Sequence, residues 1–375
     1  MRPLAVKDPS SIRVQSARGF ACLLLVTYHV IGSDADSGIH VDDESLCRYF
    51  TDLFLPIRMP LFTFLSGFVY VYKPMVRTLW RDFARRKLLR LGVPLLVAST
   101  VTFLSLLAVA HLTDGQSGIA AEMRLSTIWK IYIFPLKHLW FLQALLSVMA
   151  IVMVLEALNA LATIERFLIV FAIALLAFAV SPLGSLKVFS LHQVTFLLPF
   201  FLLGVGANRF RDILQSPIVM IAVASLFAVA LITHGIEATF GHMGVSEHTT
   251  LVPAALALSA VLCIVRWMPP SRFLQWIGNF SFSIYLYHLA LILFVGFTAE
   301  QLGIRQRPVL LLLGLAGGML LPVLLERASR HSEIAHFLLL GQRLKSKLPV
   351  SGVGFGDTMV VPALQAESAQ TRQTK

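Results

Sequence analysis

Apolar stretches of near 20 residues recur along the whole chain, and this feature constrains the fold more than any other. A helix of about 20 apolar residues crosses the hydrocarbon core of a membrane. Charged residues make up only 14% of the chain, against about 25% in soluble domains. The sequence therefore predicts an all-α, polytopic membrane protein with a bundle of about ten transmembrane helices. The predicted spans are about 17–33, 53–73, 91–111, 138–157, 166–181, 193–208, 217–234, 249–267, 280–298 and 308–325.

Lys and Arg are concentrated in alternate connections between these spans. The densest run is 73–90, which holds several cations and a single acid, Asp82. Because cytoplasmic loops are enriched in Lys and Arg, the alternation predicts that both termini are cytoplasmic. We expect three parts: a cytoplasmic segment 1–16, a membrane domain 17–326, and a cytoplasmic tail 327–375 that is basic and partly disordered.

The formal net charge of +11 has the same explanation, since the cations flank membrane spans. We therefore expect contacts with membrane lipids and no nucleic-acid partner. Two of the three cysteines, Cys22 and Cys263, lie in apolar runs. The cysteine pattern suggests neither a disulfide framework nor a metal site.

The first span places Arg18 and His29 inside one membrane helix. Eleven residues correspond to a rise of about 16 Å and to three turns plus roughly 20°, so the two side chains share a face. An ionisable residue within a membrane helix is by default a functional-site hypothesis. A neutral His29 can act as general base towards a hydroxyl, and Arg18 can bind phosphate. The alternative is a cytoplasmic anchor at Arg18 and an interhelical hydrogen bond at His29.

Two further sets of cations suggest anion binding. Arg58 lies inside the second span between Pro56 and Pro60, where it needs a carboxylate, carbonyl groups or a bound anion. Its alternative is a snorkelling side chain. Lys87 and Arg90, with the adjacent Arg86, precede the third span and can hold the phosphates of a nucleotide-bearing donor. Anionic lipid is the alternative partner for this set.

Polar residues in two later spans complete the candidate site. His138 begins the fourth span. Ser281, Tyr285 and His288 are spaced i, i+4 and i+7, so they share one face of the ninth span. Such a face points towards a cavity or towards partner helices. We predict that His138, Tyr285 and His288 bind substrate, with helix packing as the alternative for His288.

Five motifs occur in order along residues 13–325: R-x10-H, MPLFTFLSGF, K-x-x-R-L-x-x-P, HLWFL and S-x-Y-L-Y-H. Together they resemble the membrane acyltransferase-3 family, which O-acylates bacterial surface and secreted glycans. The resemblance implies a ten-helix bundle in the bacterial inner membrane. It also implies that the donor is an acyl-coenzyme A, with acetyl-coenzyme A the leading candidate, and that the acceptor is a glycan or a lipid-linked saccharide. It implies that Arg18 and His29 are the essential pair and that Lys87 and Arg90 bind the donor. The first residue of the donor motif is Lys here where relatives have Arg.

From the resemblance we expect an O-acyltransferase that moves an acetyl or succinyl group to a hydroxyl of a glycan, exopolysaccharide or lipo-oligosaccharide. His29, Arg18 and Arg58 are the expected catalytic residues, with no metal. His29 is expected to act either as general base or as the carrier of the acyl group in a transient acyl-imidazole. A transporter or flippase for a glycan or lipid-linked sugar is the main alternative, because it would share the intramembrane Arg and His residues. A non-catalytic scaffold or sensor is the third possibility.

Overall fold

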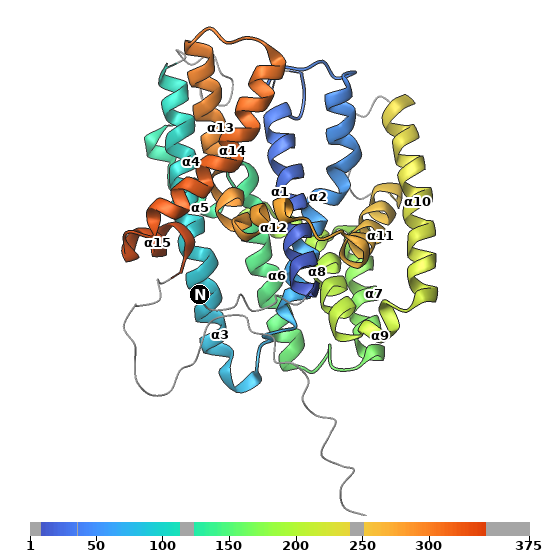
Figure 1. Ribbon diagram of the computed structural model, residues 1–375. Helices are drawn as coiled ribbons and strands as arrows, with labels where there is room; N and C mark the ends of the chain where they lie inside the picture. Colours follow the sequence, from blue (N-terminus) through green and yellow to red (C-terminus); the bar gives the residue numbers. More distant parts are fainter. Residues whose placement is uncertain (1–8, 36, 113–123, 241–250, 343–375) are drawn as a thin grey trace, which may run out of the picture. The chain divides into compact units, whose positions relative to one another are not determined.

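The computed structural model describes residues 9–35, 37–112, 124–240 and 251–342, and all regular structure in these ranges is helical. The predicted all-α fold is therefore confirmed (Figure 1). The α-helices are α1 Pro9–Ile31, α2 Leu46–Tyr70, α3 Trp80–Lys87, α4 Val93–Leu112, α5 Lys130–Ile133, α6 Trp140–Ala157, α7 Ile164–Val180, α8 Val194–Arg209, α9 Arg211–Leu214, α10 Pro217–Phe240, α11 Leu251–Trp267, α12 Arg272–Asn279, α13 Ser281–Gln301, α14 Arg307–Ser329 and α15 Glu333–Leu340.

Each of the ten predicted spans corresponds to a helix, but not every helix is long enough to cross a membrane alone. Within the described ranges, eight helical segments pass that test by length and composition. A ninth is the pair α11 and α12, which is bent by 115°. The helix at the fifth predicted span, α7, has 17 residues, fewer than the about 20 that a straight crossing requires. The chain is a multi-pass membrane protein.

Two helices begin earlier than the hydropathy pattern predicts. The second span was expected from 53, but α2 begins at Leu46 because the side chain of Ser45 caps its first turn and accepts a hydrogen bond from Arg48 N at 3.2 Å. The first helix begins at Pro9 rather than near 17. Polar residues in these early turns hid them from a criterion based on apolar runs.

The first helix is central to the packing, since α1 contacts α2, α12, α13 and α14. A Cβ atom on Gly19 of α1 would overlap the carbonyl group of Leu274, and one on Gly278 of α12 would overlap that of Gln15. Two glycines therefore let the main chains of α1 and α12 approach more closely than side chains would allow. This contact fixes α12 across α1 (Figure 1).

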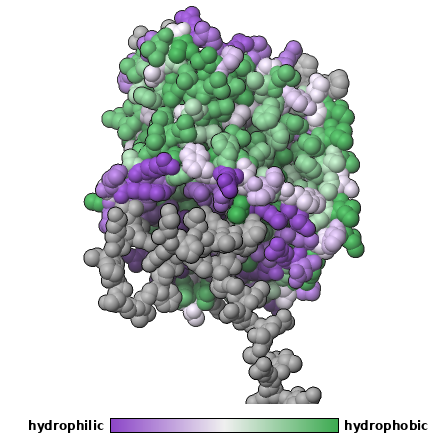
Figure 2. All heavy atoms as spheres, viewed as in Figure 1, coloured by the Kyte–Doolittle hydropathy of each residue, from purple (hydrophilic) through white to green (hydrophobic). Residues whose placement is uncertain are grey.

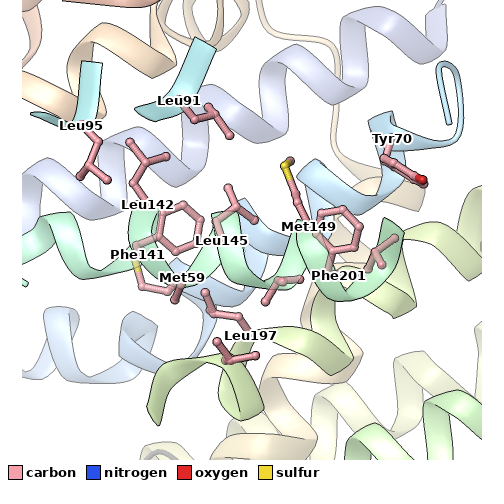
Figure 3. Packing of buried hydrophobic residues seen from close by; sticks show 14 of the residues in the cluster. Met59, Tyr70, Leu91, Leu95, Phe141, Leu142, Leu145, Met149, Leu197 and Phe201 are labelled. Atoms are coloured by element: carbon pink, nitrogen blue, oxygen red, sulfur yellow. The ribbon is translucent and has the colours of Figure 1, made fainter. Parts of the chain in front are cut away.

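Apolar side chains from α2, α6 and α8 form the largest core cluster. Phe141 of α6 lies beside Met59 of α2, and Met149 of α6 lies beside Phe201 of α8 (Figure 3). The outer surface is also largely apolar over the upper half of the view, between hydrophilic residues at the top edge and a hydrophilic band that crosses the middle (Figure 2). An apolar exterior around an apolar core is what a lipid-embedded bundle requires.

The connections and the tail are described in part. The connection 112–137 contains α5, and its residues 113–123 lie outside the described ranges. The tail that begins at 327 starts with the end of α14 and with α15. Residues 343–375 of the tail, which is expected to be partly disordered, and the loop 241–250 also lie outside the described residues.

Candidate functional site

Three histidines from distant parts of the chain lie together. His29 is in the last turn of α1, His138 is in the short 3-10 helix Lys137–Leu139, and His288 is in α13. The ring centroids of His29 and His288 are 4.8 Å apart, and those of His138 and His288 are 4.6 Å apart. The sequence singled out each residue separately, and the fold gathers them into one cluster.

Main-chain carbonyls fix where the ring protons of His29 and His288 lie. His29 Nδ1 is 2.9 Å from Leu25 O. His288 Nδ1 is 2.9 Å from Ile284 O and 2.9 Å from Tyr285 O. A carbonyl oxygen only accepts hydrogen bonds, so Nδ1 carries the proton in both rings. In the neutral tautomers that result, Nε2 of each ring has a lone pair.

One hydrogen bond can link the imidazole rings of His29 and His288, with His29 as the donor. His288 Nε2 lies 3.3 Å from His29 Nδ1 and can accept from the Nδ1–H group. His29 Nε2 has no hydrogen bond within the described chain, while the ring itself borders a cavity. The arrangement leaves His29 Nε2 free on the side of the cavity. His29 Nδ1, on the other side of the ring, is held by hydrogen bonds to Leu25 O and His288 Nε2. That is the geometry of a general base with an orienting partner.

The cavity has a volume of about 1270 Å³, above the usual 300–1,000 Å³ of small-molecule sites. The ends of α1, α13 and α14 and the segments before α6 and α8 contribute to its walls. His29, Arg58 and His138 border it directly. A cavity of this size can hold a saccharide of several units beside the free nitrogen of His29.

Arg58 contributes the deepest cation of the cavity wall. Its guanidinium carbon lies 3.7 Å from the centroid of the Tyr28 ring, which is a cation–π contact. The Nε and Nη1 atoms of Arg58 are buried without a hydrogen-bond partner. A buried guanidinium with free donors is prepared to bind an anion or a developing negative charge.

Tyr285 and His288 do not border the cavity. Tyr285 is almost fully buried, and its hydroxyl donates to His138 O at 2.8 Å. His138 Nε2 lies 3.3 Å from Leu286 O, while His138 Nδ1 is buried without a partner. The polar face predicted on α13 therefore contacts His29 and His138 on the side away from the cavity and holds them in position. Of the three residues predicted to bind substrate, only His138 borders the cavity.

The remaining predicted residues lie together elsewhere along α1. Arg90 is close enough to Arg18 for the two cations to interact electrostatically, and Lys87 interacts in the same way with Arg86 and Arg90. The Lys87 ammonium group lies 5.2 Å from the centroid of the Phe83 ring. Arg18 has no hydrogen bond or ion pair within the described chain. We name Arg18, Arg86, Lys87 and Arg90 the cation cluster.

The main chain at the cation cluster departs from a regular α-helix. Leu88–Gly92 is a π-helical segment between α3 and α4, a distortion frequent at functional sites. The C-terminal end of α15 rests on it: a Cβ atom on Gly341 would contact the main chain of Arg90. Tyr287 of α13 also donates to Leu339 O of α15, at 2.9 Å. The residue next to His288 is thus tied to the helix that covers the cation cluster.

Several cavity residues escaped the sequence analysis. Lys137, His192, Arg305 and Arg307 all border the cavity. His192 has a buried Nδ1 without a partner, and it follows Phe189 and Ser190, which have φ of 48° and 55°. The sequence did contain a signal for Arg305 and Arg307. They lie in a connection predicted to be non-cytoplasmic, and Lys and Arg are normally depleted in such connections.

The described residues contain no group of three His, Cys, Asp or Glu side chains that could hold a metal ion. The model of a family described as an acyltransferase domain matches residues 12–327 of the chain. Neither a search of curated proteins nor a search of solved structures finds a match. The matched stretch runs from the first turns of α1 to the last turns of α14 and contains every residue of the cavity and of the cation cluster.

Proposed function

Because the chain belongs to the membrane acyltransferase-3 family, we propose that it transfers an acyl group from acyl-coenzyme A to a hydroxyl of a glycan. The acyl group is acetyl in the first instance, with succinyl as the alternative, and the acceptor is an exopolysaccharide, a lipo-oligosaccharide or a lipid-linked saccharide. The observation that carries the proposal is His29, whose free Nε2 borders a saccharide-sized cavity while a second imidazole supports its Nδ1.

In this proposal His29 is the general base. Its Nε2 removes the proton of the acceptor hydroxyl as the oxygen attacks the thioester carbon. A carbon–oxygen bond forms, the carbon–sulfur bond breaks, and the proton passes from His29 to the departing thiolate of coenzyme A. His29 Nδ1–H keeps its bonds to Leu25 O and His288 Nε2 throughout, which holds the ring in one orientation. Arg58 stabilises the oxyanion with its unpartnered donors.

The cation cluster is the proposed donor site. Coenzyme A carries several phosphate charges, and Arg90 interacts electrostatically with both Arg18 and Lys87. A bound polyanion would lower the electrostatic repulsion among these cations. The residues present therefore suit a ligand that carries several phosphates. About 16 Å of α1 separates Arg18 from His29, a distance that the extended arm of coenzyme A has to bridge.

The basic cluster gives the proposed orientation. It lies on the cytoplasmic side of a bacterial inner membrane, where acyl-coenzyme A is made, and the cavity opens towards the opposite side. Both termini are then cytoplasmic.

The direct test is transfer of label from isotope-labelled acetyl-coenzyme A in inverted membrane vesicles that contain the protein and a glycan extract. Wild type is compared with His29→Ala and with His111→Ala, which removes an exposed imidazole at the end of α4. We expect label on glycan with wild type and His111→Ala and none with His29→Ala. Equal transfer by wild type and His29→Ala would overturn the assignment of the base.

The transporter alternative makes a different prediction in the same vesicles. Labelled saccharide would cross the membrane without acyl-coenzyme A, and no coenzyme A would be released. Failure of transfer with both acetyl and succinyl donors, together with such movement, would favour that alternative.

A further inference from the structure

The cavity carries an excess of positive charge that acyl transfer to a neutral sugar does not require. Among the residues that the structure describes, four cations border it, and a single acid, Glu300, does so. The cations are Arg58, Lys137, Arg305 and Arg307. Neutral saccharides are bound through hydroxyl, amide and aromatic groups, so an excess of cations points to an acceptor with negative charge.

Nearby acids neutralise only part of this charge. Arg307 Nη1 lies 3.3 Å from Asp42 Oδ2, in an exposed ion pair at the mouth. Arg58 is buried with two free donors, as described above. Lys137 makes no hydrogen bond or ion pair within the described chain, and Asp34 interacts with it only electrostatically. The buried donors of Arg58 and the exposed Lys137 are therefore both available to a ligand.

The position of these residues also argues against a role in membrane orientation. In the proposed topology the cavity opens away from the cytoplasm, where Lys and Arg are depleted. Lys137 in addition has φ of 49°, a left-handed conformation that is rare for a long side chain. Strained residues of this kind cluster at binding and active sites. Lys137 is adjacent in sequence to His138, which lies in the imidazole cluster.

We propose that the acceptor is an anionic saccharide whose carboxylate or phosphate binds Lys137, with Arg305 and Arg307 guiding it into the cavity. The proposal rests on the proposed function and specifies its acceptor. A carboxylate would come from a uronic acid, and a phosphate from a lipid-linked diphosphate or a phosphorylated sugar. The bound anion places one neighbouring hydroxyl beside His29 Nε2, so Lys137 determines specificity rather than carrying out the chemistry.

The test uses glycan extracted from cells that make the protein, in three forms: untreated, carboxyl-reduced and enzymatically dephosphorylated. Acyl transfer by wild-type protein in lipid nanodiscs is measured for each form. A loss of about tenfold or more in kcat/KM after one treatment is expected. Loss on carboxyl reduction identifies a uronic acid, and loss on dephosphorylation identifies a phosphate.

Variants of Lys137 then locate the contact. Lys137→Gly suits the left-handed main chain and removes the charge, so it should raise the KM for untreated glycan about tenfold and leave the KM for acyl-coenzyme A unchanged. Lys137→Arg keeps the charge and should restore the lower KM. Lys130→Gln removes a cation that does not border the cavity and is the matched control.

The outcomes separate the two proposals. Equal transfer to all three glycan forms, or a rise in the KM for acyl-coenzyme A in Lys137→Gly, would overturn the anionic acceptor and leave acyl transfer standing. Absence of transfer to every form would overturn the proposed function as well. Transfer that falls with one treatment and with Lys137→Gly, and recovers with Lys137→Arg, is the result that the proposal predicts.

Discussion

One helix, α1, carries two polar regions that are built in opposite ways. At His29 the imidazoles are held at defined distances by main-chain carbonyls and by one another. At Arg18, eleven residues earlier, cations lie beside other cations and the described chain provides Arg18 with no hydrogen bond. The first region fixes geometry, and the second concentrates charge.

This difference indicates which region suits acyl transfer and which suits donor binding. Transfer chemistry depends on the orientation of a few atoms, so its residues need rigid partners. Binding of a flexible polyanion depends on charge more than on a single geometry, so mobile cations suffice. We therefore expect substitutions at His29 to act on kcat and substitutions in the cation cluster to act on the KM for the donor.

The largest effect is expected from His29→Ala. Loss of a general base lowers kcat by about 10²–10⁴-fold, and the KM for acyl-coenzyme A should not change. Steady-state release of coenzyme A, followed with a thiol reagent, gives both constants. A change in donor KM with an intact kcat would reverse the roles assigned to the two regions.

Arg90→Gln is expected to have the next largest effect. It removes one charge of the proposed donor site, so the KM for acyl-coenzyme A should rise by about tenfold with little change in kcat. Arg81→Gln, which removes a cation stacked on Trp80 in the same basic segment, is the control. An equal rise in both variants would mean that the whole basic segment, rather than the cation cluster, attracts the donor.

Substitutions at His288 test whether its hydrogen bond to His29 orients the proposed base. His288→Leu removes the acceptor for His29 Nδ1–H and should lower kcat by about tenfold. His288→Gln retains an acceptor at a comparable distance from the main chain and should recover most of that loss. If both variants keep the wild-type kcat, His288 only fills space between α1 and α13.

A smaller effect is expected at Tyr285. Tyr285→Phe removes the hydrogen bond to His138 O, which contributes about 1 kcal/mol, and leaves the ring in place. The acceptor KM or kcat should change by a few-fold, with donor KM unaffected. A large rise in donor KM would contradict the separation of the two regions.

The smallest effect concerns α15, which rests on the cation cluster. Burial lowers the pKa of His336, against the opposing effect of Glu326, and its Nδ1 lies 2.9 Å from Ser329 Oγ. Because the folded state favours the neutral ring, the docking of α15 should be strongest above about pH 6.5 and weaken as pH falls below it. Hydrogen exchange in α15 at pH 7.5 and 5.5 measures this. His336→Gln should remove the difference, and an unchanged pH dependence would exclude His336.

Much of the fold could be predicted because membrane spans follow from apolar length alone. Every predicted span has a helix at its position. Pro269 and Pro270 mark the break after α11 in the sequence. The direction that α12 then takes could not be predicted, since it depends on the contact that Gly19 and Gly278 allow between α1 and α12. The π-helical segment at Leu88–Gly92 was equally hidden, because its sequence is compatible with a regular helix.

The candidate site was predictable residue by residue but not as an arrangement. His29, His138 and His288 were each marked by polarity within an apolar span, a local signal. That Arg18 lies with Arg90, while Arg58 lies with Tyr28, depends on packing between distant helices. His192 lies in a connection, where a lone polar residue carries no signal from sequence alone. Lys137 carries the same signal as Arg305 and Arg307, since it is a cation in a connection predicted to be non-cytoplasmic.

The most direct test of this account is the binding of coenzyme A itself to the purified protein in lipid nanodiscs, measured by titration calorimetry. Wild type is compared with Arg18→Gln and with His29→Ala. The account predicts that Arg18→Gln weakens binding about tenfold or more and that His29→Ala binds as wild type does. Weaker binding in His29→Ala with unchanged binding in Arg18→Gln would contradict the assignment of donor binding to one region of α1 and acyl transfer to the other.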